Sequence, residues 1–147
     1  MTETASDAVP ELERLRFKLN FFKLNTADIE RATSFYRQTF GLEERTRVDL
    51  PTLSEVMLAM PGEQFTLVLL SYKDDRSYEV GTSTGPVGFL TRDVDGAVAR
   101  VLAHGGTLLH ATAELKGMRF AFVADPDGNA IELIQFVRDA PAAGQAA

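Results

Sequence analysis

An internal repeat constrains the fold of this chain more than any other feature of its sequence. Asp28 and Asp93 lie 65 positions apart, and each stands between a strand-like run and a run with apolar residues at helical spacing. An Asp side chain at such a junction accepts hydrogen bonds from the free N–H groups of the first helical turn. The repeat therefore predicts two helices that start alike, at about 29–40 and 94–104.

Three strand-like runs follow each predicted helix. In the first half they lie at about 44–49, 55–60 and 64–72, and in the second half at about 107–112, 119–124 and 130–137. With the run before the helix, each half reads βαβββ, which predicts an α+β fold built from two such modules. A half of about 60 residues is marginal alone, so we expect the modules to form and share curved mixed sheets around a cup-shaped cavity.

The pattern also divides the chain into segments. The two modules are predicted at residues 17–76 and 85–137, and the polar stretch 77–84 links them. Residues 1–16 are polar, and residues 138–147 are small and low in complexity. Such compositions lack the apolar surface that packing requires, so both ends are predicted to be flexible tails.

Composition excludes several classes of protein. The formal net charge is −6, and no cluster of Lys or Arg provides the basic face that nucleic-acid binding requires. There are no cysteines, so disulfides and thiolate metal sites are excluded. No apolar run is long enough for a transmembrane helix, and the N-terminus lacks the features of a secretory signal. We therefore expect a cytoplasmic protein with no membrane or nucleic-acid partner.

One charged residue stands where a charge is costly. The segment "FVADPDGNAIEL" at 122–133 places a turn rich in Asp, Pro and Gly between two strand-like runs. Glu132 lies inside the second of these apolar runs. A buried carboxylate costs several kcal/mol unless it is paired or bound to a metal. Glu132 is therefore the first candidate for a functional residue.

The repeat and two of its segments resemble a known family. The segments "LNTADIERATSFYRQTFGLE" and "FVADPDGNAIELIQ", with the paired βαβββ pattern, are similar to the vicinal oxygen chelate superfamily. That superfamily includes glyoxalase I, extradiol dioxygenases and bleomycin-resistance proteins. The resemblance covers roughly residues 17–137. It implies a cupped fold whose enzymes usually hold one divalent metal with four side chains.

Only one of the four implied metal-ligand positions keeps a donor. The positions that the resemblance assigns to the ligands carry Phe21, Val68, Pro86 and Glu132 in this chain. Phe, Val and Pro side chains cannot coordinate a metal, and a divalent ion requires several N or O donors. We therefore expect no metal and no cofactor.

The two histidines do not replace the missing ligands. His104 lies at the end of the second predicted helix, where a basic side chain favours the terminal carbonyls. His110 lies in a strand and could point into the cup, but one His and one Glu do not make a four-ligand site.

Alternation along the strands predicts which side chains line the cup. If Glu132 faces inward, alternation places Phe21, Lys23, Asn25, Val68, Leu70 and Tyr72 on the same inner surface. The resemblance to the superfamily implies that Met118, Phe120 and Phe122 face inward as well. This lining is mostly apolar and aromatic with a few polar groups, which is typical of a small-molecule pocket.

Lys23 and Glu132 admit three interpretations. They could form an ion pair that replaces the charge of the metal, since burial demands pairing. One of them could instead meet the ligand, with Lys23 binding an anionic group or Glu132 acting as a general base. In the third, the register differs and Lys23 extends to solvent.

Two functions from different classes remain open. The first is a metal-independent binding protein, similar to the bleomycin-resistance branch, that holds an aromatic or amphipathic small molecule. The second is an enzyme, a lyase, isomerase or ring-modifying catalyst, that uses Glu132 with Lys23 or Tyr72. A metal-dependent glyoxalase or dioxygenase is a further version of the enzyme hypothesis, which the missing ligands disfavour. Because cups in this superfamily are often completed by a partner, we also expect a homodimer.

Overall fold

The structure is a computed structural model that describes residues 5–137. Its elements, in chain order, are α1 (Ala5–Leu15), β1 (Phe21–Asn25), α2 (Ile29–Phe40), β2 (Glu43–Asp49), β3 (Leu53–Ala59), β4 (Thr66–Tyr72), β5 (Val87–Leu90), α3 (Val94–Ala103), β6 (Thr107–Leu115), β7 (Met118–Ala124) and β8 (Ala130–Phe136). Within this range, no helix is both long and apolar enough to cross a membrane.

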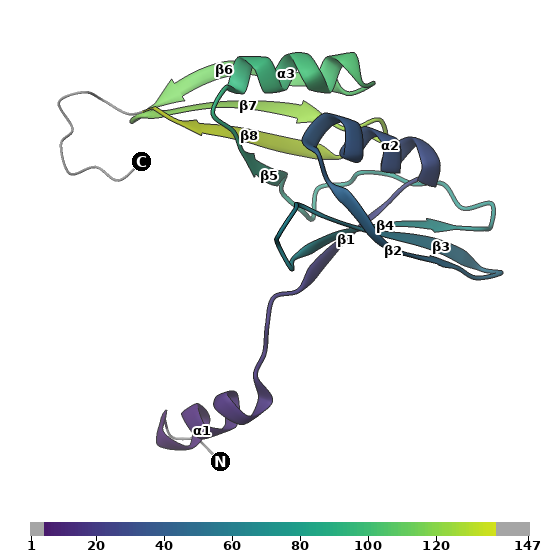
Figure 1. The fold of residues 1–147 in the computed structure, drawn as a ribbon, viewed down its shortest axis with the longest axis vertical. Coiled ribbons are helices and arrows are strands. Elements are labelled where there is room, and N and C mark those ends of the chain that lie inside the picture. Colours follow the sequence, from purple (N-terminus) through teal and green to yellow (C-terminus); the bar gives the residue numbers. More distant parts are fainter. Residues whose placement is uncertain (1–4, 138–147) are drawn as a thin grey trace.

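Each module forms one four-stranded mixed sheet (Figure 1). Sheet A has the order β1-β4-β3-β2, and sheet B has the order β5-β8-β7-β6. The first strand of each module runs parallel to the last, and the other pairs are antiparallel. The predicted α+β fold of two βαβββ modules is confirmed.

The two module helices begin as the repeat predicts. Asp28 accepts a hydrogen bond from the backbone N–H of Arg31, and Asp93 accepts one from that of Gly96. Helix α2 ends at Gly41, whose φ of 79° is a left-handed conformation that glycine adopts without strain. The matching caps confirm that Asp28 and Asp93 occupy equivalent helix starts.

The modules share a core rather than one sheet. No strand of sheet A pairs with a strand of sheet B among the described residues, so the expectation of a common sheet within the chain is wrong. The buried apolar side chains of both modules instead form a single cluster. Phe40 of α2 stacks on Phe89 of β5 with ring centroids 3.9 Å apart. Arg100 of α3 donates to the backbone oxygen of Thr39, which joins the two helices.

Helix α1 stands away from the two modules. An extended stretch connects it to β1, and the helix projects from the rest of the molecule (Figure 1). The sequence predicted a flexible tail for residues 1–16, and the structure places this helix inside it. The predicted tail at 138–147 lies outside the described residues.

Strand β6 is longer than its predicted bounds. It runs to Leu115 and pairs with β7, which begins at Met118, through a two-residue hairpin turn. The turn residues Lys116 and Gly117 have φ values of 47° and 80°. Positive φ at both positions suits the twist of a tight hairpin. Gly117, in the sequence "LKGM", is the residue type that such a turn favours.

Candidate functional site

The predicted site residues of the first module lie on the face of sheet A that α2 does not cover. Lys23 is in register with Val68, and Asn25 is in register with Leu70, so their side chains share one face. Their neighbours Leu24, Leu67 and Leu69 point the other way, into the core. Phe21 and Tyr72 belong to the same alternating set, at the start of β1 and the end of β4. We call this surface the open face of sheet A.

Lys23 forms its ion pair within this face. Its Nζ lies 2.5 Å from a carboxylate oxygen of Glu55 on β3, and the Lys23 and Glu55 side chains are 42% and 13% exposed. The pair reaches across β4, where Val68 and Leu70 are buried. Of the three interpretations of Lys23 and Glu132, the ion pair between them is therefore not the one found within the described residues.

Three predicted polar residues line one cavity. Lys23, Asn25 and Tyr72 contribute to a hollow of about 390 Å³ beside the linker between the modules. Arg76, the residue just before that linker, places its guanidinium carbon 3.6 Å from the ring centroid of Tyr72. The linker thus folds over Tyr72, and a cation–π contact holds it there.

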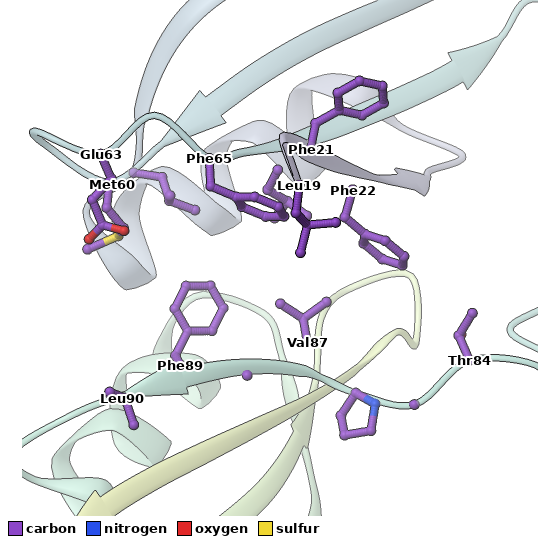
Figure 2. Close-up of a pocket in the computed structure, with 15 residues that line it drawn as sticks. Leu19, Phe21, Phe22, Met60, Glu63, Phe65, Thr84, Val87, Phe89 and Leu90 are labelled. Carbon is purple, nitrogen blue, oxygen red and sulfur yellow. The ribbon is translucent and has the colours of Figure 1, made fainter. Parts of the chain in front are cut away.

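A larger cavity lies between the edge strands of the two sheets. It has a volume of about 800 Å³ and is walled by apolar side chains from β1 and its approach on one side and from β5 on the other (Figure 2). Leu19, Phe22 and Phe65 face Val87 and Phe89 across it. Phe21 and Pro86, two of the implied ligand positions, belong to its lining. Glu63 is its charged lining residue.

The predicted residues of the second module lie on the face of sheet B that points away from the core, which we call the open face of sheet B. Glu132 is in register with Phe122 of β7, and Ile134 is in register with Phe120. Met118 lies opposite Phe136 on the same face, whereas Ala121 and Val123 point into the core. The side chain of Glu132 is half-buried. The structure therefore places Glu132 and Lys23 on different sheets.

Within sheet B, one row of side chains crosses all four strands at Glu132. Gly88, Glu132, Phe122 and His110 are successive partners in the strand register. The rings of His110 and Phe122 meet edge to face with centroids 6.4 Å apart, and Phe120 meets Phe122 in the same way at 6.0 Å. The carboxylate thus lies between a residue without a side chain and a group of aromatic rings.

The turn before Glu132 has a structural role. The carboxylate of Asp125 is buried and accepts hydrogen bonds from the hydroxyl of Tyr36, at 2.7 Å, and from the backbone N–H groups of Asp127 and Asn129. Burial, followed by the charge and hydrogen bond of Asp125, raises the pKa of Tyr36 well above its usual value. The turn therefore anchors the second module to α2.

The same turn also binds the residues that precede α2. Asp127 accepts hydrogen bonds from the Thr26 hydroxyl at 2.6 Å and the Ala27 backbone N–H at 3.1 Å. It also pairs with Arg31 at 3.2 Å. These contacts favour the reading of the Asp-Pro-Asp-Gly segment as a turn that joins the modules.

The residues at the implied ligand positions do not fit a divalent metal. Phe21 and Val68 lie on sheet A, while Pro86 and Glu132 belong to the second module, so the four do not meet in one chain. Three of them have no donor atom in the side chain. In the part of the chain that the structure describes, no group of three or more His, Cys, Asp or Glu side chains is placed to hold a metal.

Sequence reasoning missed Glu55, which the structure brings to the centre of the open face of sheet A. Glu55 is a charged residue inside the strand run "LSEVMLA", the same signal that singled out Glu132. Alternation from Met57 would have placed it on the same face as Lys23. With Glu55 recognised on this face, the sequence would also have offered a partner for Lys23.

Comparison with known proteins assigns the family. The sequence profile of the Glyoxalase/Bleomycin resistance protein/Dioxygenase superfamily matches residues 18–133, which cover most of both modules. The chain belongs to this superfamily. The match confirms the resemblance carried by the repeat and by the segment around the Asp-Pro-Asp-Gly turn.

Relatives within the glyoxalase superfamily carry the name lactoylglutathione lyase. One from Arabidopsis thaliana is 33% identical over 139 residues, an alignment that covers 89% of this chain and 48% of that protein. One from Neisseria meningitidis serogroup A is 30% identical over 118 residues and covers 76% of this chain and 86% of that protein. The chain thus spans about half the length of its plant relatives.

Solved structures of the superfamily share the fold. A glyoxalase I from Zea mays superposes with a TM-score of 0.73 at 24% identity, over 82% of this chain and 45% of that one. A superfamily member from Sphaerobacter thermophilus superposes with a TM-score of 0.66 at 29% identity, over 81% of this chain and 97% of that one.

Proposed function

We propose that the chain is a metal-independent member of the glyoxalase superfamily that binds a small aromatic or amphipathic molecule. The observation that carries this proposal is the character of the open faces. The positions that would hold a metal carry Phe21, Val68 and Pro86, and the aromatic ring of Phe122 is the register neighbour of the remaining Glu132. Small-molecule sites are typically lined by apolar and aromatic side chains with a few polar groups. The cytoplasmic location stays a prediction.

Metal analysis and ligand binding test this function together. Protein purified and dialysed should contain less than stoichiometric divalent metal, and a neutral apolar dye such as Nile red should gain fluorescence on binding to it. Chelation with EDTA should leave that binding unchanged. Stoichiometric metal that survives dialysis, with binding lost on chelation, would contradict the proposal.

A lyase is the second candidate, and the names of the relatives favour it. In that case Glu132 acts as a general base on a bound substrate, with Lys23 or Tyr72 as its partner. Lys23 and Tyr72 lie on sheet A and Glu132 lies on sheet B, so this candidate requires an arrangement that brings the two open faces together, such as a dimer. Formation of lactoylglutathione by the purified chain without added metal, and its loss in Glu132→Gln, would establish this candidate over the binding protein.

The exposed edges of both sheets support a homodimer. Strands β1 and β5 each pair on one side only among the described residues. They expose large apolar side chains, with Phe21 51% and Leu90 72% accessible. Unpaired apolar edges are a liability for a monomer. Light scattering at micromolar concentration should give twice the chain mass of 16.1 kDa, and a monomer mass would contradict this assembly.

A further inference from the structure

Glu132 has no cationic partner within the described part of the chain. Lys23 is occupied by Glu55 on the other sheet, at 2.5 Å. Arg119, on the strand next to Glu132, pairs with Asp95 at 2.9 Å on the opposite face of sheet B. In residues 5–137, the side chain of Glu132 forms no ion pair and no hydrogen bond. This half-buried carboxylate on an apolar face therefore has no counter-charge among the described residues, and a bound cation would supply one.

Gly88 leaves open space beside this carboxylate. It is the register partner of Glu132 in the parallel β5–β8 pair, so a side chain at Gly88 would lie on the same face. A Cβ built there meets no atom within 4 Å, and its φ lies outside the left-handed region that favours glycine. Neither the backbone nor a close neighbour requires glycine at this position. Its effect is open space next to Glu132.

The other side of Glu132 is aromatic. Phe122 is its register partner on β7, and Phe120 and His110 place their rings against Phe122. The faces of aromatic rings attract cations through their quadrupoles, most strongly where water is excluded. A carboxylate flanked by aromatic rings and by an empty position presents matched groups for an organic cation.

We infer that the open face of sheet B binds an aromatic or alkyl ammonium compound, with Glu132 as counter-ion, Phe120 and Phe122 as aromatic contacts and Gly88 as the space that admits the ligand. This inference rests on the proposed binding function and names its ligand class. It assigns to Gly88 the part of a specificity-determining residue, since any side chain there fills the position beside the carboxylate.

Three phenyl compounds of similar size but different charge test the inference on the full chain. They are 2-phenylethylammonium, 3-phenylpropanoate and 3-phenylpropan-1-ol, and binding is followed by NMR titration. The ammonium should bind about tenfold more tightly than the carboxylate, because only the cation gains the ion pair with Glu132 and the cation–π contact with the rings. Glu132→Gln should remove this preference. Gly88→Ala and Gly88→Val should weaken ammonium binding in that order while the melting temperature stays unchanged or rises.

Glu114→Gln is the matched control, because Glu114 is an exposed carboxylate on β6 of the same sheet. It should keep the preference for the cation. Equal binding of the three compounds, or a preference for the cation that survives in Glu132→Gln, would overturn the inference. If Nile red still binds in that case, the proposed binding function is retained. Absence of ammonium binding together with absence of Nile red binding would overturn both.

Discussion

The two modules repeat one plan but place their charges differently in equivalent rows. In sheet A the row that crosses the strands is Lys23, Val68, Met57 and Thr46, and in sheet B it is Gly88, Glu132, Phe122 and His110. Lys23 and Gly88 hold the same place on the first strand of their modules, and Val68 and Glu132 hold the same place on the last. The row of sheet A carries a cation where the row of sheet B has no side chain, and the carboxylate of sheet B replaces a valine.

The turns before the last strands differ as well. Asp125 of the second module is buried and accepts a hydrogen bond from Tyr36 of α2. Its counterpart 65 positions earlier is Met60, which packs against the apolar core. The counterpart of Tyr36 is Val101, which is also fully buried. A hydrogen bond thus joins the turn of the second module to α2, where the equivalent turn of the first module places an apolar side chain.

The largest expected effect follows from breaking this polar anchor. Asp125→Ala removes the acceptor for Tyr36 and for the backbone groups of Asp127 and Asn129, and leaves the Tyr36 hydroxyl buried without a partner. We expect the free energy of unfolding to fall by about 3 kcal/mol or more. Urea denaturation followed by circular dichroism measures this loss.

The equivalent turn supplies the control for Asp125→Ala. Met60→Ala truncates an apolar side chain that is partly exposed, so its cost should be smaller. If Asp125→Ala costs no more than Met60→Ala, the two turns contribute alike and the proposed difference between the modules fails.

A smaller effect is expected from the tyrosine side of the same bond, and it depends on pH. The pKa of Tyr36 is raised in the folded protein, first by burial and then by Asp125. Above about pH 10 the unfolded chain loses this proton while the folded chain retains it, so the stabilisation is full below pH 10 and declines as the pH rises. Tyr36→Phe should cost about 1–3 kcal/mol at neutral pH. It should also flatten the loss of stability in alkali.

Denaturation curves at pH 8 and pH 11 measure that slope. Tyr78→Phe is the matched control, because it removes a tyrosine hydroxyl from the linker between the modules. An alkaline slope that is the same in Tyr36→Phe and in the unchanged protein would show that Tyr36 does not titrate differently on unfolding.

Local sequence signals were sufficient to predict most of the fold. The helix starts at Asp28 and Asp93 depend on hydrogen bonds within one turn of the chain, and the strand alternation depends on neighbouring residues. The way the modules meet depends on contacts distant in sequence, such as Phe40 with Phe89 and Tyr36 with Asp125. No local pattern encodes those partners, so the expected common sheet was replaced by a common core.

The sequence predicted which face of a sheet each candidate side chain occupies, but not which residue that side chain contacts. Alternation grouped Lys23 with Val68, and the resemblance to the superfamily grouped Phe122 with Glu132; the strand register pairs both sets of residues. The partner of Lys23 could not be predicted in this way, since its side chain reaches past β4 to Glu55 two strands away. The partner of such a long side chain depends on which charges lie near it in the folded sheet, and alternation along one strand does not give this information.

The smallest expected effect concerns that ion pair, and it tests whether sheet A is neutral on its own. Lys23 is partly exposed, and exposed ion pairs contribute little because water screens them. A double-mutant cycle with Lys23→Met and Glu55→Gln should therefore give a coupling energy of about 0.2–1 kcal/mol in favour of the pair. A second cycle with Lys23→Met and Glu132→Gln, at protein concentrations well below any dimer dissociation constant, should give none. Coupling in the second cycle but not the first would mean that Lys23 serves Glu132 after all, and the two rows would then form one charge-balanced site in which an external cation is not required.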